Sequence, residues 1–153
     1  MSFADLFKNA IFPSLGATDK SGVIQELLES LAERKMIPKK EVDSLTAEVV
    51  EREQLGSTGI GKGIGIPHIK TDLVKELTCA LGTSEEGIDF AAIDGDPVYT
   101  IFLILAPNDD NESYLNLLRW ISSLARNRDF CRFIRMPQSS EDIQSLLHEM
   151  TSA

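Results

Sequence analysis

The sequence is poor in the residues that metal sites and disulfide frameworks require. Its 153 residues include only two cysteines, Cys79 and Cys131, and two histidines, His68 and His148. The cysteines lie far apart within apolar patterns and lack metal-site spacing, so both are predicted to be small core or half-core residues. The histidines form no H-x-x-x-H pair. We therefore expect neither a metal nor a cofactor.

Long apolar runs and excess positive charge are also lacking. The longest apolar stretch, from Tyr99 to Ala106, has about the length of one buried strand and falls well short of the ~20 residues of a membrane helix. Residues 1–12 do not have the pattern of a signal peptide. The net charge is −9, whereas nucleic-acid binding depends on Lys and Arg that neutralise phosphates. We expect a cytoplasmic protein that binds no nucleic acid and does not insert into a membrane.

Hydrophobic periodicity predicts two helices, then several strands, then three helices. The helices are expected over residues 21–35, after Pro38, and at 112–126, 129–135 and from 139 onward. Strands are expected at 77–82 and 98–106, and Asp94-Gly95 is typical of a hairpin turn between them. The continuous apolar run at 98–106 predicts a central strand that is covered on both faces. The fold class that follows is α/β, with a mixed β-sheet sandwiched between helices in a single domain of residues 1–153.

Between the helical and strand segments, glycine alternates with larger residues from Gly59 to Ile66. Period two is the spacing of a strand and would place four glycines on one face. Because glycine weakens a strand, such a row indicates close approach by another backbone or a ligand. His68 follows directly after Pro67. This segment is therefore predicted to be a strand that leads into a functional site.

Two interpretations of this segment find little support. Residues Gly56 to Lys62 match the nucleotide-binding pattern G-x-x-x-x-G-K, but Gly63 stands where Ser or Thr would hold magnesium. The predicted order of elements is also reversed, because a P-loop follows a strand, whereas a helix precedes this segment. A titration with ATP that shows no binding would exclude this alternative. A hydrolytic site is also poorly supported, because the sequence has no serine in a G-x-S-x-G elbow.

Phosphoryl transfer through His68 fits better. It needs a neutral imidazole nitrogen as nucleophile, a hydrogen bond on the other ring nitrogen, and donors around the phosphoryl oxygens. Ser57 and Thr58 offer hydroxyls, Gly59 offers an accessible backbone N–H, and Arg52 offers a planar guanidinium that matches phosphate. The alternative is a core histidine beside an exposed arginine at a helix end.

The residues Arg52-Glu53, Gly56 to Gly61 and Ile64 to His68 resemble the signature of enzyme IIA domains of the bacterial phosphoenolpyruvate-dependent phosphotransferase system, fructose/mannitol and nitrogen-regulatory class. The resemblance covers nearly the whole chain. It implies that His68 receives a phosphoryl group from the small phosphocarrier protein (HPr-like) and that Arg52 stabilises it. The phosphoryl group would pass to a IIB component, or its presence would signal to a regulatory target. A chain of 153 residues with a leading helical segment resembles the nitrogen-regulatory branch more than a dedicated sugar component.

One departure from the family pattern concerns Tyr114. Many members carry a second active-site histidine at this position, whereas a phenol can donate a hydrogen bond but supplies no cation at neutral pH. We include Tyr114 among the predicted catalytic residues with His68 and Arg52. A second hypothesis also follows from it, in which the chain is a non-catalytic regulatory docking module with an inert His68.

Overall fold

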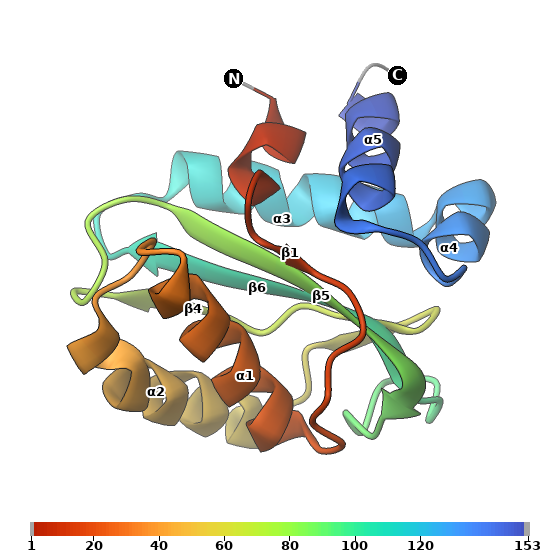
Figure 1. The fold of residues 1–153 in the computed structure, drawn as a ribbon. Coiled ribbons are helices and arrows are strands. Elements are labelled where there is room, and N and C mark those ends of the chain that lie inside the picture. The colour runs from red at the N-terminus through yellow and green to blue at the C-terminus, as the bar shows by residue number, and fades with distance from the viewer. Residues whose placement is uncertain (1, 152–153) are drawn as a thin grey trace.

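The computed structural model describes residues 2–151, so residues 1 and 152–153 of the predicted domain lie outside the described part. A mixed sheet lies between two layers of helices (Figure 1). Helices α1 (Lys20–Glu33) and α2 (Val42–Leu55) cover one face, and the other is covered by α3 (Glu112–Ala125), α4 (Arg128–Ile134) and α5 (Ser140–Thr151). The predicted fold class and all five predicted helices are confirmed.

Strand β6 (Val98–Pro107) lies at the centre of the sheet. On one side it pairs antiparallel with β5 (Thr78–Ile88), which pairs parallel with the short β1 (Ile11–Phe12). On the other side, β3 (Ile64–Gly65) and then β4 (His68–Thr71) pair parallel with successive parts of β6. Strand β2 (Gly59–Gly61) pairs with β3. Two short 3-10 helices, η1 (Phe3–Phe7) and η2 (Lys39–Glu41), complete the described elements.

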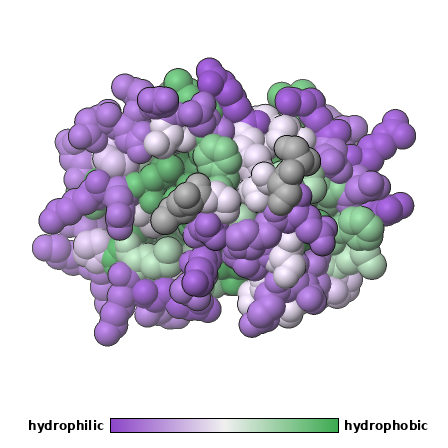
Figure 2. Space-filling model, turned by 90° about the horizontal axis from the view of Figure 1, so that it is seen from above, coloured by the Kyte–Doolittle hydropathy of each residue, from purple (hydrophilic) through white to green (hydrophobic). Residues whose placement is uncertain are grey.

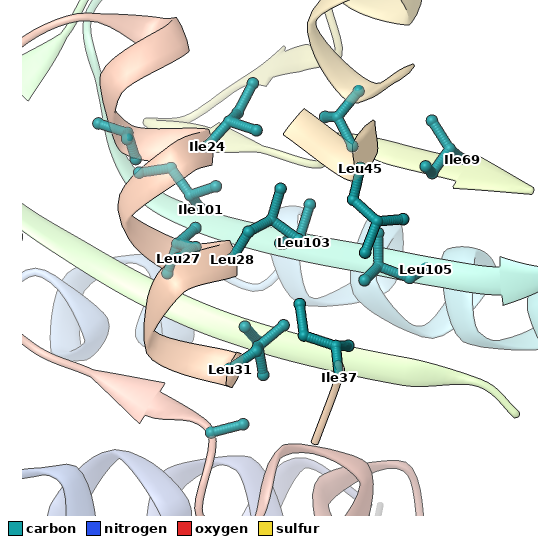
Figure 3. Packing of buried hydrophobic residues seen from close by; sticks show 14 of the residues in the cluster. Ile24, Leu27, Leu28, Leu31, Ile37, Leu45, Ile69, Ile101, Leu103 and Leu105 are labelled. Atoms are coloured by element: carbon teal, nitrogen blue, oxygen red, sulfur yellow. The ribbon is translucent and has the colours of Figure 1, made fainter. Parts of the chain in front are cut away.

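The side chains of β6 fill both halves of the core. Ile101, Leu103 and Leu105 pack beneath α1 and α2 (Figure 3), and the residues between them pack against α3, α4 and α5. This confirms the prediction of a central strand that is covered on both faces. Seen from above, the helical layer of α3 to α5 is largely hydrophilic where it meets solvent, with hydrophobic groups gathered in patches (Figure 2). No helix within residues 2–151 is long and apolar enough to span a bilayer.

Helix starts follow the expected chemistry. The Asp19 carboxylate accepts a hydrogen bond from the Gly22 N–H at the start of α1. At α5, the Asp142 N–H donates to the Ser139 hydroxyl and the Ser139 N–H donates to the Asp142 carboxylate, which is a reciprocal capping box. Sequence patterns did not predict η1 and β1, because segments of five and two residues are too short for a periodicity to show.

The glycine-rich segment is a hairpin, so the prediction of one continuous strand is wrong. Lys62 and Gly63 form the turn between β2 and β3, with φ values of 59° and 76°. A two-residue turn with positive φ at both positions matches the twist of the flanking strands. The chain then leaves the ladder at Pro67, which has no N–H to donate, before β4 begins at His68. Together the turn and this break place His68 at the edge of the sheet.

The glycines admit close neighbours, and these neighbours are protein atoms. A Cβ on Gly65 would lie 2.9 Å from Cε2 of the buried Phe90, and a Cβ on Gly59 would lie 2.8 Å from the Ala92 Cβ. Both neighbours belong to the connection that joins β5 to β6 and contains the predicted Asp94-Gly95 turn. That connection is longer than a two-residue hairpin, although β5 and β6 pair antiparallel as predicted.

Gly65→Ala should destabilise the protein by about 1 to 3 kcal/mol, because the added methyl group overpacks against the Phe90 ring. Gly56→Ala is the matched control: its φ of 162° is ordinary extended backbone, and a Cβ added there would meet no atom within 4 Å beyond its chain neighbours. We expect the control to change stability by less than about 0.5 kcal/mol. Urea unfolding measures both, and equal values for the two variants would contradict this packing.

Candidate functional site

Three predicted catalytic residues meet in one open hollow of about 420 Å³. The hollow lies where the C-terminal end of α2, the start of β4 and the start of α3 come together. Arg52 comes from α2, His68 from β4 and Tyr114 from α3. The complete lining is Glu48, Glu51, Arg52, Leu55, His68, Ile69, Lys70 and Tyr114. Residues that lie far apart in the sequence are thus brought together by the pairing of β4 with β6.

The backbone on either side of Pro67 fixes the position of His68. The Ile66 N–H donates to the Thr58 carbonyl at 3.1 Å, and the Ile104 N–H of β6 donates to the Pro67 carbonyl at 3.0 Å. The Ile66 carbonyl accepts a hydrogen bond from Nδ1 of His68. All of these backbone groups are therefore used, and none needs a ligand.

The same hydrogen bond decides the tautomer of His68. A carbonyl oxygen can only accept, so Nδ1 carries the proton and the neutral ring keeps its lone pair on Nε2. The pKa of the half-buried His68 lies below its usual value of 6.5, chiefly because burial disfavours the imidazolium. The Arg52 cation lowers this pKa further, while the hydrogen bond to Ile66 and the Glu53 carboxylate oppose the shift. The ring is therefore a neutral nucleophile at pH 7.

Arg52 and Tyr114 line the same hollow as the imidazole. Nη1 of Arg52 donates to the Gly56 carbonyl at 3.0 Å, which ties the guanidinium to the end of its own helix. The ring of the buried Tyr114 lies with its centroid 6.0 Å from the His68 centroid. Burial raises the pKa of the Tyr114 phenol, and the Arg52 cation only partly offsets this effect. Tyr114 therefore stays neutral and can act as a hydrogen-bond donor.

A buried carboxylate on α2 holds the loop that leads to His68. Glu53 is 6% exposed and accepts hydrogen bonds from the Thr58 N–H, the Thr58 hydroxyl and the Lys20 ammonium, the last at 3.0 Å. Lys20 also lies over the Phe90 ring, with Nζ 4.8 Å from the centroid. Glu53 belongs to the Arg52-Glu53 motif, but sequence periodicity assigns it no role. Glu53 continues the apolar stripe of α2 by one turn. An acidic residue at such a buried position is the sequence signal that could have identified it.

The three residues predicted to bind phosphoryl oxygens lie beside the hollow and do not line it. The Ser57 hydroxyl donates to the Phe90 carbonyl and accepts from the Gly59 N–H at 3.0 Å. The Thr58 hydroxyl donates to Glu53. These polar groups already have protein partners. Phosphoryl binding by Ser57, Thr58 and Gly59 stays a prediction.

Lys70 is a residue of the hollow that sequence reasoning missed. It is exposed on β4, two positions after His68, and its Nζ lies 5.5 Å from the centroid of the Tyr114 ring. Side chains two positions apart point to the same side of a strand. This alternation was the available signal, but it depends on knowing that a strand begins at His68.

The nucleotide-binding interpretation does not fit the geometry. Gly56 to Lys62 runs from the end of α2 through β2 into a turn, so no helix N-terminus follows Lys62 to receive a phosphate. The other histidine, His148, lies on α5 with Nε2 3.4 Å from the Asp5 carboxylate. Within the described part of the chain, no group of three His, Cys, Asp or Glu residues is placed to hold a metal ion.

Comparison with protein families finds one match that spans most of the chain. A family described as "Phosphoenolpyruvate-dependent sugar phosphotransferase system, EIIA 2" matches residues 6–150. A protein named PTS system fructose-specific EIIA component, from Haloferax volcanii, is 35% identical over 131 residues, which are 86% of this chain and 84% of that protein. A Nitrogen regulatory protein from Bradyrhizobium diazoefficiens is 32% identical over 138 residues, covering 90% and 88%.

Solved structures have the same fold. The Nitrogen Regulatory Protein IIA-Ntr from Neisseria meningitidis superposes with a TM-score of 0.78 at 24% identity, covering 94% of this chain and 97% of that one. A complex of enzyme IIA mannitol with phosphorylated enzyme IIB mannitol, from Escherichia coli, gives a TM-score of 0.74 at 19% identity, covering 92% and 95%. In that relative, the IIA protein partners with a IIB component.

We expect His68 to titrate with a midpoint below 6.5, and Arg52→Met to move this midpoint upward, because removing a nearby cation makes protonation easier. Histidine ring signals followed by NMR against pH measure the effect, and a His148→Gln background leaves a single histidine to assign. Arg126→Met, which removes an exposed cation at the end of α3, is the control and should leave the midpoint in place. A downward shift in Arg52→Met would contradict the described geometry.

Proposed function

The chain belongs to the EIIA 2 family of the phosphoenolpyruvate-dependent sugar phosphotransferase system, and from this premise we propose that Nε2 of His68 carries the phosphoryl group. The protein is a phosphoryl carrier of the sugar or nitrogen-regulatory type. The single observation that supports His68 as its site is the Nδ1 hydrogen bond to Ile66, which directs the lone pair of a neutral ring away from the backbone.

The proposed transfer needs no proton movement at His68. The Nε2 lone pair attacks the phosphorus of the phosphorylated donor, a bond from nitrogen to phosphorus forms, and the bond from phosphorus to the donor atom breaks with its electron pair staying on the donor. Nδ1 keeps its proton and its hydrogen bond to Ile66 throughout. The positive charge that develops on the ring is shared with this polarised carbonyl, while the phosphoryl oxygens keep their negative charge.

Arg52 and Tyr114 are proposed to bind the phosphoryl oxygens. A guanidinium has five N–H donors, and only Nη1 is used in the bond to Gly56. Its fixed charge and planar donors match the phosphoryl group. The neutral Tyr114 phenol lies beside the imidazole and would donate one further hydrogen bond. Each such donor is worth up to roughly 3 kcal/mol in the transition state if it behaves like an oxyanion-hole donor.

Ser57, Thr58 and Gly59 are proposed to contribute mainly as the support of this site. The two hydroxyls and the backbone N–H groups of Thr58 and Gly59 already have protein partners, so that any phosphoryl contact from these donors would require one of these bonds to be exchanged. Loss of the Thr58 hydroxyl would leave the buried Glu53 with fewer donors and loosen the hydrogen bond from Ile66 to Thr58.

The partners follow from the same role. We propose the small phosphocarrier protein as the donor in the cytoplasm, and a IIB component or a regulatory target as the acceptor. Leu55, which is 83% exposed on the rim of the hollow, offers apolar contact area to such a protein. The same exposed leucine, together with Tyr114 at the position of the usual second histidine, favours the alternative of a docking module with an inert His68.

Phosphotransfer in vitro tests the proposal. The purified protein, incubated with phosphoenolpyruvate and the general phosphotransfer proteins of its host, should gain the mass of one acid-labile phosphoryl group. His68→Ala should abolish the gain, because it removes the nucleophile, whereas His148→Gln should retain it. Intact-mass spectrometry provides the readout.

The controls separate the two hypotheses. Circular dichroism establishes that the variants are folded, and a known IIA protein establishes that the donors are active. A gain that persists in His68→Ala would show that the phosphoryl group is elsewhere. No gain in the folded wild-type protein would exclude the carrier role of His68 and leave the docking module.

A further inference from the structure

The charges that line the hollow do not favour a phosphoryl group if Arg52 acts alone. Glu48 and Glu51, on the same helix as Arg52, also line it. The Thr71 hydroxyl donates to Glu48 at 3.3 Å. Two carboxylates against one guanidinium give a net charge of −1 when His68 is neutral. A phosphoryl group adds about −1.5 to −2 more. An additional cation would therefore reduce the repulsion between a phosphoryl group and the two carboxylates.

Lys70 is the remaining cation of the hollow. Its addition brings the formal charge of the lining to zero, since Arg52 and Lys70 together balance Glu48 and Glu51. It projects from β4 on the same side as His68, two residues along the strand. Its ammonium group lies over the Tyr114 ring, 5.5 Å from the centroid, and that ring lies 6.0 Å from the imidazole.

The Tyr114 ring can position a positive charge near His68, although the neutral phenol carries none itself. The negative face of an aromatic ring attracts an ammonium group. The ring holds the Lys70 charge near His68 without forming an ion pair that would neutralise it. No acidic partner of Lys70 within 4.0 Å is found among residues 2–151.

We propose, resting on the phosphoryl-carrier function above, that Lys70 is a further catalytic residue whose ammonium group contacts the phosphoryl oxygens on His68, with the Tyr114 ring as its support. Lys70 and Arg52 form a two-cation clamp, one from β4 and one from α2. The clamp supplies the positive charge that the tyrosine itself lacks.

The test compares Lys70→Met, Lys70→Arg and Lys75→Met, the last of which removes an exposed lysine outside the hollow. Phosphoryl uptake from excess phosphorylated donor is followed by quenched intact-mass measurements. Lys70→Met should be slower on the order of tenfold or more. Lys70→Arg should restore most of the rate because it keeps the charge, and Lys75→Met should match the wild type.

A second readout separates contact with the phosphoryl group from docking of the donor. In the purified phosphoprotein, the ³¹P signal of phospho-His68 reports the last ionisation of the phosphoryl group. The midpoint of this titration should move to higher pH in Lys70→Met and stay in place in Lys75→Met, because a nearby cation favours the dianion. A merely structural or docking role would not move it.

The outcomes are distinct. A wild-type protein that gains no phosphoryl group on His68 contradicts the proposed function itself. A phosphorylated wild type whose rate and ³¹P midpoint are both unchanged in Lys70→Met overturns the role of Lys70 alone. A lower rate with an unchanged midpoint also overturns it, since Lys70 would then act on the donor rather than on the phosphoryl group.

Discussion

The two hydrogen bonds of the Ile66 backbone are the constraint on which the site depends. The Ile66 N–H is held by the Thr58 carbonyl, and its carbonyl holds Nδ1 of His68. Thr58 is in turn bound to the buried Glu53 carboxylate, which also accepts from Lys20 of α1. A continuous series of hydrogen bonds thus links α1 to the His68 ring. Burying the Glu53 carboxylate costs free energy unless its hydrogen-bond donors are in place. The series therefore favours one position of the loop that contains Thr58.

The geometry of the sheet explains why the His68 ring is accessible. Pro67 cannot donate to β6, so the parallel pairing of this edge is interrupted between β3 and β4, and the freed Ile66 backbone turns to its local partners. His68 then begins β4 at the margin of the hollow while its ring stays half-buried. Partial burial keeps the imidazole neutral, and the open side leaves room for a second protein to approach.

Sequence patterns predicted the layers, the five helices and the central strand, because long apolar periodicities depend little on distant contacts. The motif around His68 also indicated Arg52, and the family resemblance indicated Tyr114; the structure brings both into one hollow with His68. The β2–β3 hairpin was missed because the glycine alternation has the same period in one long strand as in two short ones. The two arrangements differ in the backbone of Lys62 and Gly63, whose positive φ values form the turn. Glu53 and Lys70 were missed, because Glu53 contacts Lys20 and Lys70 contacts Tyr114, and both partners lie far away in the sequence.

The most direct test of this account is the chemistry of the two ring nitrogens. The phosphorylated protein, labelled with ¹⁵N-histidine, is examined by long-range ¹H–¹⁵N correlation NMR. The account predicts phosphorus coupled to Nε2 of His68 and a proton retained on Nδ1, as the hydrogen bond to Ile66 requires. Phosphorus on Nδ1 would contradict it, because that atom would have to give up the bond on which the arrangement of the site depends.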